Sequence, residues 1–388
     1  MNSLPEHAES SRAAAKEISA GKYRVIFMQP IMSVRSHRIC EPYHNPSNRD
    51  DWLQPVSIAV MDNSTGSFFA LGPEQVIQAI ESTGLLCNGF QLALNSYENR
   101  VYQIGLEDAP PVVAKFYRPN RWSDAAIIEE HDFTLELAAM DIPVIAPMVI
   151  DGATLHHAGA FRLALYPCRP GRAPDLENRQ QLQQLGRYIA RIHALGAAHD
   201  FIHRPELNVH TFGDDACGYL FDNGFIPTEL ESAYNNVAEE LLDGIEEIFA
   251  DASPHKIRLH GDGHPGNILW HEQSPFIVDF DDARMGPAVQ DLWMFLTGDR
   301  AQQASILDTL LAAYTQFYDF DRSELALIEP LRALRIMHHA AWLARRWDDP
   351  AFKAAFPWFN THHYWQEQLQ SLTEQLTAIE QPPLQWLG

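Results

Sequence analysis

Hydrophobic and polar positions alternate over short distances in the first part of the chain. Between residues 91 and 166 the apolar residues form short runs, rich in β-branched and aromatic side chains, that turn residues separate. Such runs are typical of strands. One helix is predicted to open at Pro73 and close at Gly84, and another to follow Ser123, a suitable N-cap. The predicted strands cover 91–94, 101–104, 112–117 and 161–166.

Beyond about residue 180 the apolar positions recur every three or four residues, which predicts a mainly helical region. Pro167, Pro170 and Gly171 precede it and are typical of a hinge. Only the segment from His260 to Pro287 breaks the helical pattern, with a polar loop and a predicted strand over 276–280. The predicted helices cover 181–195, 235–250, 289–296, 306–317 and 330–347.

These patterns predict an α+β fold with a small β-rich lobe before a large helical lobe. We place the first, nucleotide-binding lobe at 61–167 and the second, with the catalytic loop and metal site, at 168–388. Residues 1–60 are polar, contain proline and lack periodicity, so we expect a poorly ordered extension. Met61 begins the first patterned segment and is a candidate translation start.

Charge and composition exclude several classes of function. Lys and Arg number 28 against 51 Asp and Glu, a net charge of −23 that repels nucleic acids and anionic lipids. No run is long and apolar enough to span a membrane. The four cysteines are scattered without metal-binding spacing, which favours a reducing compartment. We therefore expect a cytoplasmic protein without nucleic-acid or membrane partners.

The segment after Leu259 carries the strongest chemical signal. His260, Asp262 and Asn267 stand in the spacing His-x-Asp-x-x-x-x-Asn of a kinase catalytic loop. In such a loop the Asp faces the acceptor hydroxyl, and the Asn faces a metal bound to the phosphates. The following predicted strand supplies a second metal ligand, Asp279, with Asp281 as the alternative because residues two apart on a strand share a face. The loop predicts a protein-kinase-like fold and phosphoryl transfer.

Two other interpretations of this loop are weaker. His260, His264 and Asp262 could form a zinc site, but the next strand offers only carboxylates. A surface turn would also be rich in Gly, Pro, Asp and Asn. A turn alone does not explain why an acid-rich strand follows so closely.

A lysine in the N-terminal lobe is the second, independent signal. Lys115 lies in the middle of a predicted strand, where an unpaired charge would be costly to bury. In a kinase such a lysine binds the α- and β-phosphates and is positioned by a helix glutamate. Glu130 lies near the apolar face of the next helix, and Glu129 is the alternative. An edge-strand lysine facing solvent is the competing interpretation of Lys115.

The loop 95–100 between the first two predicted strands lacks the glycines of a phosphate-binding loop. The Ser96 hydroxyl and the backbone amides could still contact phosphate oxygens, although a polar hairpin turn is equally consistent. Asp291, at the start of the predicted helix 289–296, is expected to hydrogen-bond the backbone of the catalytic loop rather than to react. Helix capping is its alternative.

These motifs resemble the aminoglycoside phosphotransferase and choline kinase group, and more closely the bacterial stress response kinase A family. The resemblance runs from about Phe68 to the C-terminus. Beyond the catalytic loop it includes Leu94-Asn-Ser-Tyr-Glu-Asn-Arg-Val-Tyr-Gln103, Val113-Ala-Lys-Phe-Tyr-Arg-Pro119, Phe201-Ile-His-Arg-Pro205, Asp281-Asp-Ala-Arg284, Gly286-Pro-Ala-Val-Gln-Asp-Leu-Trp293 and Ala341-Trp-Leu-Ala-Arg-Arg-Trp347.

The resemblance implies an autophosphorylating Ser/Thr protein kinase that uses ATP and Mg²⁺ in stress response. It makes Asp262 the proton acceptor, Asn267 and Asp279 the Mg²⁺ ligands, and Ser96 a nucleotide contact. A small-molecule kinase of the same fold, acting on an amino alcohol, sugar or antibiotic, is the nearest rival, and a catalytically silent ATP-binding protein is the other. We expect a monomer.

Overall fold

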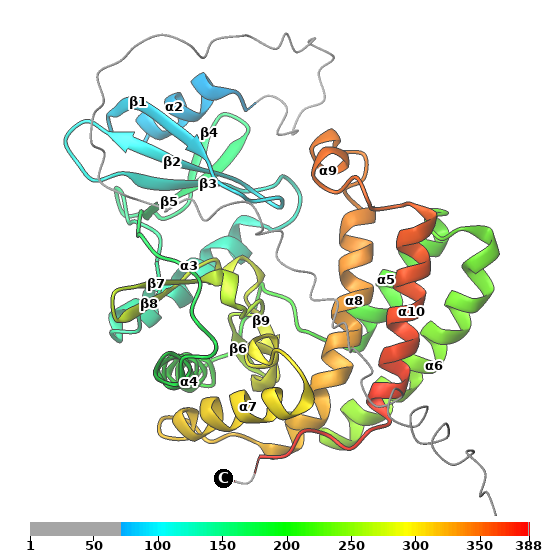
Figure 1. The fold of residues 1–388 in the computed structure, drawn as a ribbon. Helices are drawn as coiled ribbons and strands as arrows, with labels where there is room; N and C mark the ends of the chain where they lie inside the picture. The colour runs from blue at the N-terminus through cyan, green and yellow to red at the C-terminus, as the bar shows by residue number, and fades with distance from the viewer. Residues whose placement is uncertain (1–70, 387) are drawn as a thin grey trace, which may run out of the picture.

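The computed structural model describes residues 71–386 and 388, so the predicted extension 1–60 and the candidate start Met61 lie outside the described residues. The chain forms two lobes (Figure 1). We keep the division at Pro167 for naming, so that the N-lobe is 71–167 and the C-lobe is 168–388. Between them lies the site that the motifs predict.

The N-lobe contains one antiparallel sheet of five strands in the order β1-β2-β3-β5-β4. Helix α2 lies against β1, and α3 lies between this sheet and the C-lobe (Figure 1). The predicted elements are present. Strands β1, β2 and β5 are longer than the pattern indicated, β3 is one residue shorter, and β4 was not predicted. The elements are α2 (Pro73–Glu81), β1 (Cys87–Ala93), β2 (Arg100–Leu106), β3 (Val112–Phe116), α3 (Asp124–Ala139), β4 (His156–Ala158) and β5 (Phe161–Pro167).

Helix α3 connects the cores of the two lobes. Ser123 caps it, as predicted, by accepting a hydrogen bond from the Ala126 amide. Ile127 packs beneath the N-lobe sheet with Ala164, whereas Phe133 and Leu137 belong to the main hydrophobic cluster of the C-lobe. The helix is therefore held from both sides, which fixes the side chains that it presents to the space between the lobes.

The C-lobe is mainly helical, with two small two-stranded sheets that carry the catalytic loop. Helices α5, α6, α8 and α10 pack together, and α9 stands at the end of α8 nearest the N-lobe (Figure 1). The helices are α4 (Arg179–Gly196), α5 (Asp215–Asp222), α6 (Thr228–Ala252), α7 (Arg300–Tyr314), α8 (Ile328–Ala344), α9 (Pro350–Ala355) and α10 (His362–Ile379). The strands are β6 (Ile257–Leu259), β7 (Ile268–His271), β8 (Ser274–Ile277) and β9 (Arg284–Gly286).

Two predicted elements are wrong in detail. The strand expected over 276–280 ends at Ile277, because Asp279 adopts a left-handed conformation with φ 64° and a short 3₁₀ helix, Phe280–Asp282, follows. The helix expected over 289–296 is two 3₁₀ turns, Ala288–Asp291 and Trp293–Phe295. The remaining single-turn helices are His210–Asp214, a π-helix, and the 3₁₀ helices Pro265–Asn267 and Arg322–Leu327.

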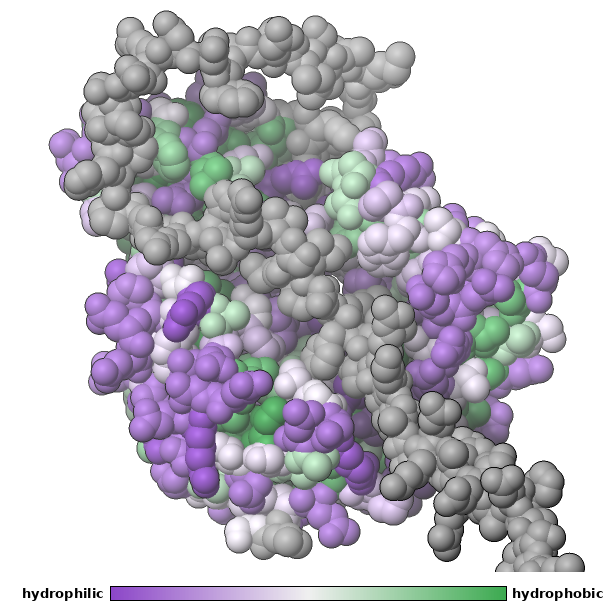
Figure 2. All heavy atoms as spheres, in the orientation of Figure 1, coloured by the Kyte–Doolittle hydropathy of each residue, from purple (hydrophilic) through white to green (hydrophobic). Residues whose placement is uncertain are grey.

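Hydrophilic residues cover most of the visible face of the C-lobe (Figure 2), in keeping with the large excess of acidic side chains in the sequence. Within residues 71–386, no helix is both long and apolar enough to cross a membrane.

Candidate active site

The loop from His260 to Asn267 runs between β6 and β7, and Asp291 fixes its first turn. One carboxylate oxygen of Asp291 accepts a hydrogen bond from the His260 amide, and the other accepts one from the Gly261 amide, both at 2.8 Å. This confirms the supporting role predicted for Asp291. Gly261 has φ +82°, and a Cβ there would lie 2.1 Å from the carbonyl oxygen of Asp282, so only glycine fits.

Asp262 lies near the centre of this loop and is surrounded by cations. Its Oδ1 accepts a hydrogen bond from Arg335 Nη1 at 2.7 Å, and its Oδ2 lies 3.3 Å from His264 Nε2. Burial raises the pKa of Asp262, but Arg335 and His264 outweigh burial and hold that pKa well below its usual value. The carboxylate is therefore ionised at neutral pH and can accept hydrogen bonds or a proton.

Asn267 comes directly before β7 and Asp279 two residues after β8, and the pairing of these two strands brings their ends together. The carbonyl of Asn267 accepts a hydrogen bond from the Val278 amide, and His260 Nε2 donates to the Val278 carbonyl at 2.9 Å. His260 thus ties the catalytic loop to the residue before Asp279. The side-chain nitrogen of Asn267 donates a hydrogen bond to the Asp262 carbonyl at 3.0 Å. The side-chain oxygen of Asn267 takes no part in this bond.

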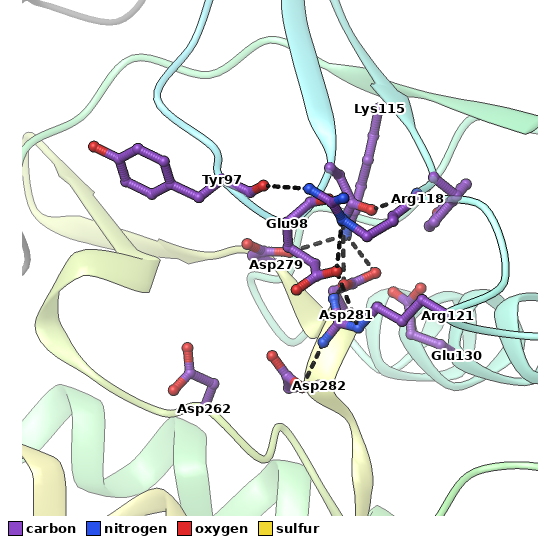
Figure 3. A network of polar contacts seen from close by, with 12 residues as sticks. Tyr97, Glu98, Lys115, Arg118, Arg121, Glu130, Asp262, Asp279, Asp281 and Asp282 are labelled. Carbon is purple, nitrogen blue, oxygen red and sulfur yellow. Dashed lines mark hydrogen bonds and ion pairs between the residues drawn. The ribbon is translucent and has the colours of Figure 1, made fainter. Parts of the chain in front are cut away.

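Lys115 reaches this site from the N-lobe. It lies in β3 between Val101 of β2 and Ala164 of β5, and only 7% of its surface is exposed. Its Nζ lies 2.9 Å from Asp279 Oδ1 and 3.1 Å from Asp281 Oδ1 (Figure 3). Burial lowers the pKa of Lys115, but the two carboxylates outweigh burial and raise it well above its usual value. The alternative of a solvent-facing edge lysine is wrong.

The two candidate glutamates of α3 have different environments. Glu130 is 2% exposed, lies 3.7 Å from Arg204 Nη2 and interacts electrostatically with Lys115. Burial raises the pKa of Glu130 to about 7, against the opposing effect of Lys115 and Arg204. Glu129 instead accepts hydrogen bonds from the amides of Ile202, His203 and Arg204. Glu130 is therefore the glutamate on the side of Lys115.

The matched relatives cover nearly the whole described chain. The chain is 42% identical to stress response kinase A of Escherichia coli K12 over 325 residues, 84% of this chain and 98% of that protein. It is 41% identical, with the same coverage, to the serine/threonine protein kinase RdoA of Salmonella typhimurium LT2. The model of the phosphotransferase enzyme family matches residues 90–328.

The chain belongs to the stress response kinase A family.

Solved structures place this stress response kinase A family member in the two-lobed kinase-like fold. Amicoumacin kinase, solved in complex with AMP-PNP, Ca²⁺ and Ami, has a TM-score of 0.62 and 20% identity, over 79% of this chain and 94% of that one. A microcompartment-associated aminopropanol kinase has a TM-score of 0.58 and 15% identity, over 79% and 96%. These likenesses establish the fold, and the close relatives establish that the chain is a kinase.

The residues of this kinase could hold a divalent cation. Asp279 has 52% of its side chain exposed and contacts Lys115 through one oxygen only, and the Asn267 amide oxygen has no partner among the described residues. A carboxylate and an amide oxygen are ligands of the kind that Mg²⁺ prefers. By contrast, residues 71–386 contain no group of three His, Cys, Asp or Glu side chains arranged to hold a metal ion. His260 and His264 are engaged within the loop, so the zinc interpretation has no support.

Several arginines that the motifs do not predict also lie around the site. Arg121 contacts Asp281 and donates to Asp282 at 2.8 Å, and Arg335 reaches Asp262 from α8 (Figure 3 shows the Arg121 contacts). Arg118 and Arg346 meet at Glu98, in the same loop as Ser96, whose own hydroxyl makes no hydrogen bond within the described residues. Arg121 follows Pro119-Asn120 and comes shortly before α3, so the sequence does place a cation at the start of that helix. Arg335 gives no local signal.

Proposed function

We propose that this chain is an ATP- and Mg²⁺-dependent Ser/Thr protein kinase. The observation that carries the proposal is the convergence of Lys115, Asp262, Asn267 and Asp279 between the lobes, from strand β3, the catalytic loop and the segment after β8. Phosphoryl transfer needs these parts: a cation for the non-transferred phosphates, ligands for a metal and a base for the acceptor hydroxyl. All three chemistries are present within one small region.

In the proposed mechanism ATP lies between the lobes with its adenine near the hinge at 165–167. Lys115 neutralises the non-transferred phosphates, and Glu130 helps to position Lys115 from α3. Ser96 contacts the nucleotide from the β1–β2 loop. Asn267 and Asp279 would hold Mg²⁺, which when bound offsets the negative charge that develops on the leaving oxygen. We choose Asp279 over Asp281 because Asp281 is buried between Lys115, Arg121 and Asn99.

Asp262 acts as the catalytic base, and His260 positions it. Its low pKa keeps the carboxylate ionised, so that it orients a Ser or Thr hydroxyl and accepts the proton late in the transfer. Arg335 holds Oδ1, which leaves Oδ2, near His264 and Asn267, to face the acceptor. Positioning and fixed charges supply most of the acceleration in such a site.

A protein acceptor, autophosphorylation and a role in stress response are part of the proposal. The names of the close relatives, stress response kinase A and a serine/threonine protein kinase, support the protein acceptor and the role in stress response. Autophosphorylation is what the family resemblance of the motifs implies. We also propose a cytoplasmic location, which the spacing of the cysteines and the acidic composition favour.

The test compares label transfer from γ-labelled Mg-ATP by the native chain, by Asp262→Asn and by a control, Asp243→Asn, on the exposed face of α6. We expect label on Ser or Thr, and a loss of about 10²- to 10⁴-fold in Asp262→Asn only. Nucleotide binding measured on the same samples shows that the variant is folded. Undiminished labelling by Asp262→Asn contradicts the assigned base. Transfer only to a small alcohol or sugar makes the protein a small-molecule kinase.

A further inference from the structure

A pocket of about 290 Å³ lies between the turn before α3 in the N-lobe and several segments of the C-lobe. It is formed by the turn before α3, the segment that precedes α5, the residues after Asp281 and one face of α8. Its lining combines four arginines with aromatic rings and a histidine. The residues that carry the argument are Arg121, Arg284, His338, Trp342, Arg345 and Arg346.

Basic side chains outnumber acidic ones in the lining of this pocket, with four arginines against three carboxylates. Of the three acids in its lining, Glu206 pairs with Lys256 at 2.5 Å, and Asp215 lies 3.5 Å from His210. Asp282 is shared by Arg121 and Arg284, which both contact its Oδ1. Two acids outside the lining also pair with these arginines, since Arg121 contacts Asp281 and Arg346 contacts Glu98. Within the described residues Arg345 has no carboxylate partner and donates only to the Asp215 carbonyl. A pocket lined by four arginines is notable in a protein of net charge −23.

The pKa values of the lining groups differ according to their partners. Burial acts to lower the pKa of Arg121, but Asp281 and Asp282 outweigh burial and raise it. Burial lowers the pKa of Arg284, and Arg121 adds to the effect against Asp282. Burial also lowers the pKa of Arg346, with contributions from Arg121 and Arg118. Burial and the neighbouring Arg284, Arg335 and Arg345 lower the pKa of His338 to about 3. Arg284, Arg346 and His338 thus each lie in the field of other cations.

Helix α8 connects this pocket to the catalytic base. Arg335 donates to Asp262, and His338, Trp342 and Arg345 follow it by three, seven and ten positions on nearly the same face. At about 1.5 Å per residue the lining begins about 5 Å and extends about 15 Å along the helix from Arg335. An extended peptide covers this distance in about two to four residues.

We propose that this pocket binds the acidic side chains that flank an acceptor Ser or Thr, two to four residues from it. This inference rests on the proposed protein kinase function and specifies its substrate class. Guanidinium groups bind carboxylates through two parallel hydrogen bonds, and the rings of Trp342 and Trp122 cover the apolar parts of a peptide. Amino alcohols and aminoglycosides are cations and would be repelled there.

The direct test uses three peptides of equal length with one central Ser, flanked by acidic, amide or basic residues. We expect kcat/KM to fall in that order, by about tenfold or more from acidic to amide flanks, and the difference to shrink as salt rises. Equal use of the three peptides, or preference for the basic one, overturns the proposal.

Two variants of Arg345 test whether the preference for acidic flanks arises in this pocket. Arg345 is exposed and makes one backbone hydrogen bond, so its replacement should not disturb the fold. Arg345→Glu should lower the ratio of acidic to amide peptide use about tenfold, mainly through KM, and Arg345→Gln should lower it less. The matched control is Arg187→Glu, at the contact of α4 with Gln316, which should keep the native ratio. An unchanged ratio in Arg345→Glu overturns the proposal.

Binding of fluorescent peptides without ATP separates this inference from the proposed function. Tighter binding of the acidic peptide that Arg345→Glu abolishes, without transfer of label to any protein, supports the pocket and contradicts the kinase proposal. Transfer of label to peptides, with no preference for acidic flanks in either assay, supports the kinase proposal and contradicts the proposed role of the pocket.

Discussion

Glu324 is a buried carboxyl group whose hydrogen-bond partner is a backbone amide rather than a cation. Its Oε2 accepts a hydrogen bond from the Val289 amide at 2.8 Å, and 3% of the residue is exposed. Burial raises the pKa of Glu324 to about 7. The folded state therefore favours the protonated form. Relative to the unfolded chain, the resulting stability is fully present below the ordinary pKa of 4.5 and is lost as pH rises towards 7.

We predict that Glu324→Gln stabilises the protein above about pH 7, by about 2 kcal/mol, and has little effect below about pH 4.5. The neutral amide keeps an oxygen for Val289 and removes the cost of the buried charge. Thermal unfolding across this pH range measures the effect, with Glu247→Gln on the exposed face of α6 as the control. A variant that is less stable than the native chain at about pH 8 contradicts the assignment.

Single residues also show what sequence reasoning can predict. The sequence predicts that Lys115 has a partner, because an unpaired lysine in an apolar strand is costly to bury. The structure shows that its partners are Asp279 and Asp281. Arg335 was missed because its partner, Asp262, lies 73 residues away and nothing in the local helix pattern marks it. The sequence alone indicates that a charged side chain would be costly to bury without a partner. Which distant residue is that partner depends on the fold.

At the scale of elements, the pattern predicts most of the long helices and strands, but it gives no separate helix for α10 and fails on the short segments around the site. The pattern over 289–296 is apolar enough for a helix. The chain instead forms two 3₁₀ turns, with the Asp291 carboxylate bonded to the amides of His260 and Gly261. Likewise Asp279 leaves the strand pattern by adopting a positive φ. Tertiary hydrogen bonds override local propensity where the side chains of the site must be placed.

Asp291 therefore offers a test of how the catalytic loop is held. Its carboxylate also accepts a hydrogen bond from His193 Nε2 at 3.2 Å, and an asparagine would place an N–H group against at least one of these donors. We predict that Asp291→Asn lowers the free energy of unfolding by about 1–3 kcal/mol and reduces phosphoryl transfer more than nucleotide binding. Denaturant unfolding and kinetics measure the two effects. Asp308→Asn, exposed on α7, is the control, and equal stability of the two variants contradicts the prediction.

At the scale of the whole molecule, the loop that carries Ser96 is fastened to the C-lobe. Glu98 accepts a hydrogen bond from Trp342 Nε1 at 2.6 Å and pairs with Arg346 at 2.5 Å and with Arg118 at 3.1 Å. The neighbouring Tyr97 ring packs against Phe356, with centroids 4.7 Å apart. Trp342 is 244 residues away from Glu98, so this contact between the lobes could not be read from the local pattern.

We predict that Glu98→Gln releases the loop 95–99 from α8 while the rest of the fold persists. The amide removes the negative charge that Arg118 and Arg346 share. It also turns an N–H group towards hydrogen-bond donors, so the contact between the loop and α8 loses more than one interaction. Hydrogen exchange of the loop amides should quicken by about tenfold or more, with little change in the core of α6. Glu239→Gln, exposed on α6, controls for the change of net charge. Native protection of 95–99 in Glu98→Gln would show that the packing of Tyr97 against Phe356 and the hydrogen bond from Asn99 to Asp281 hold the loop without Glu98.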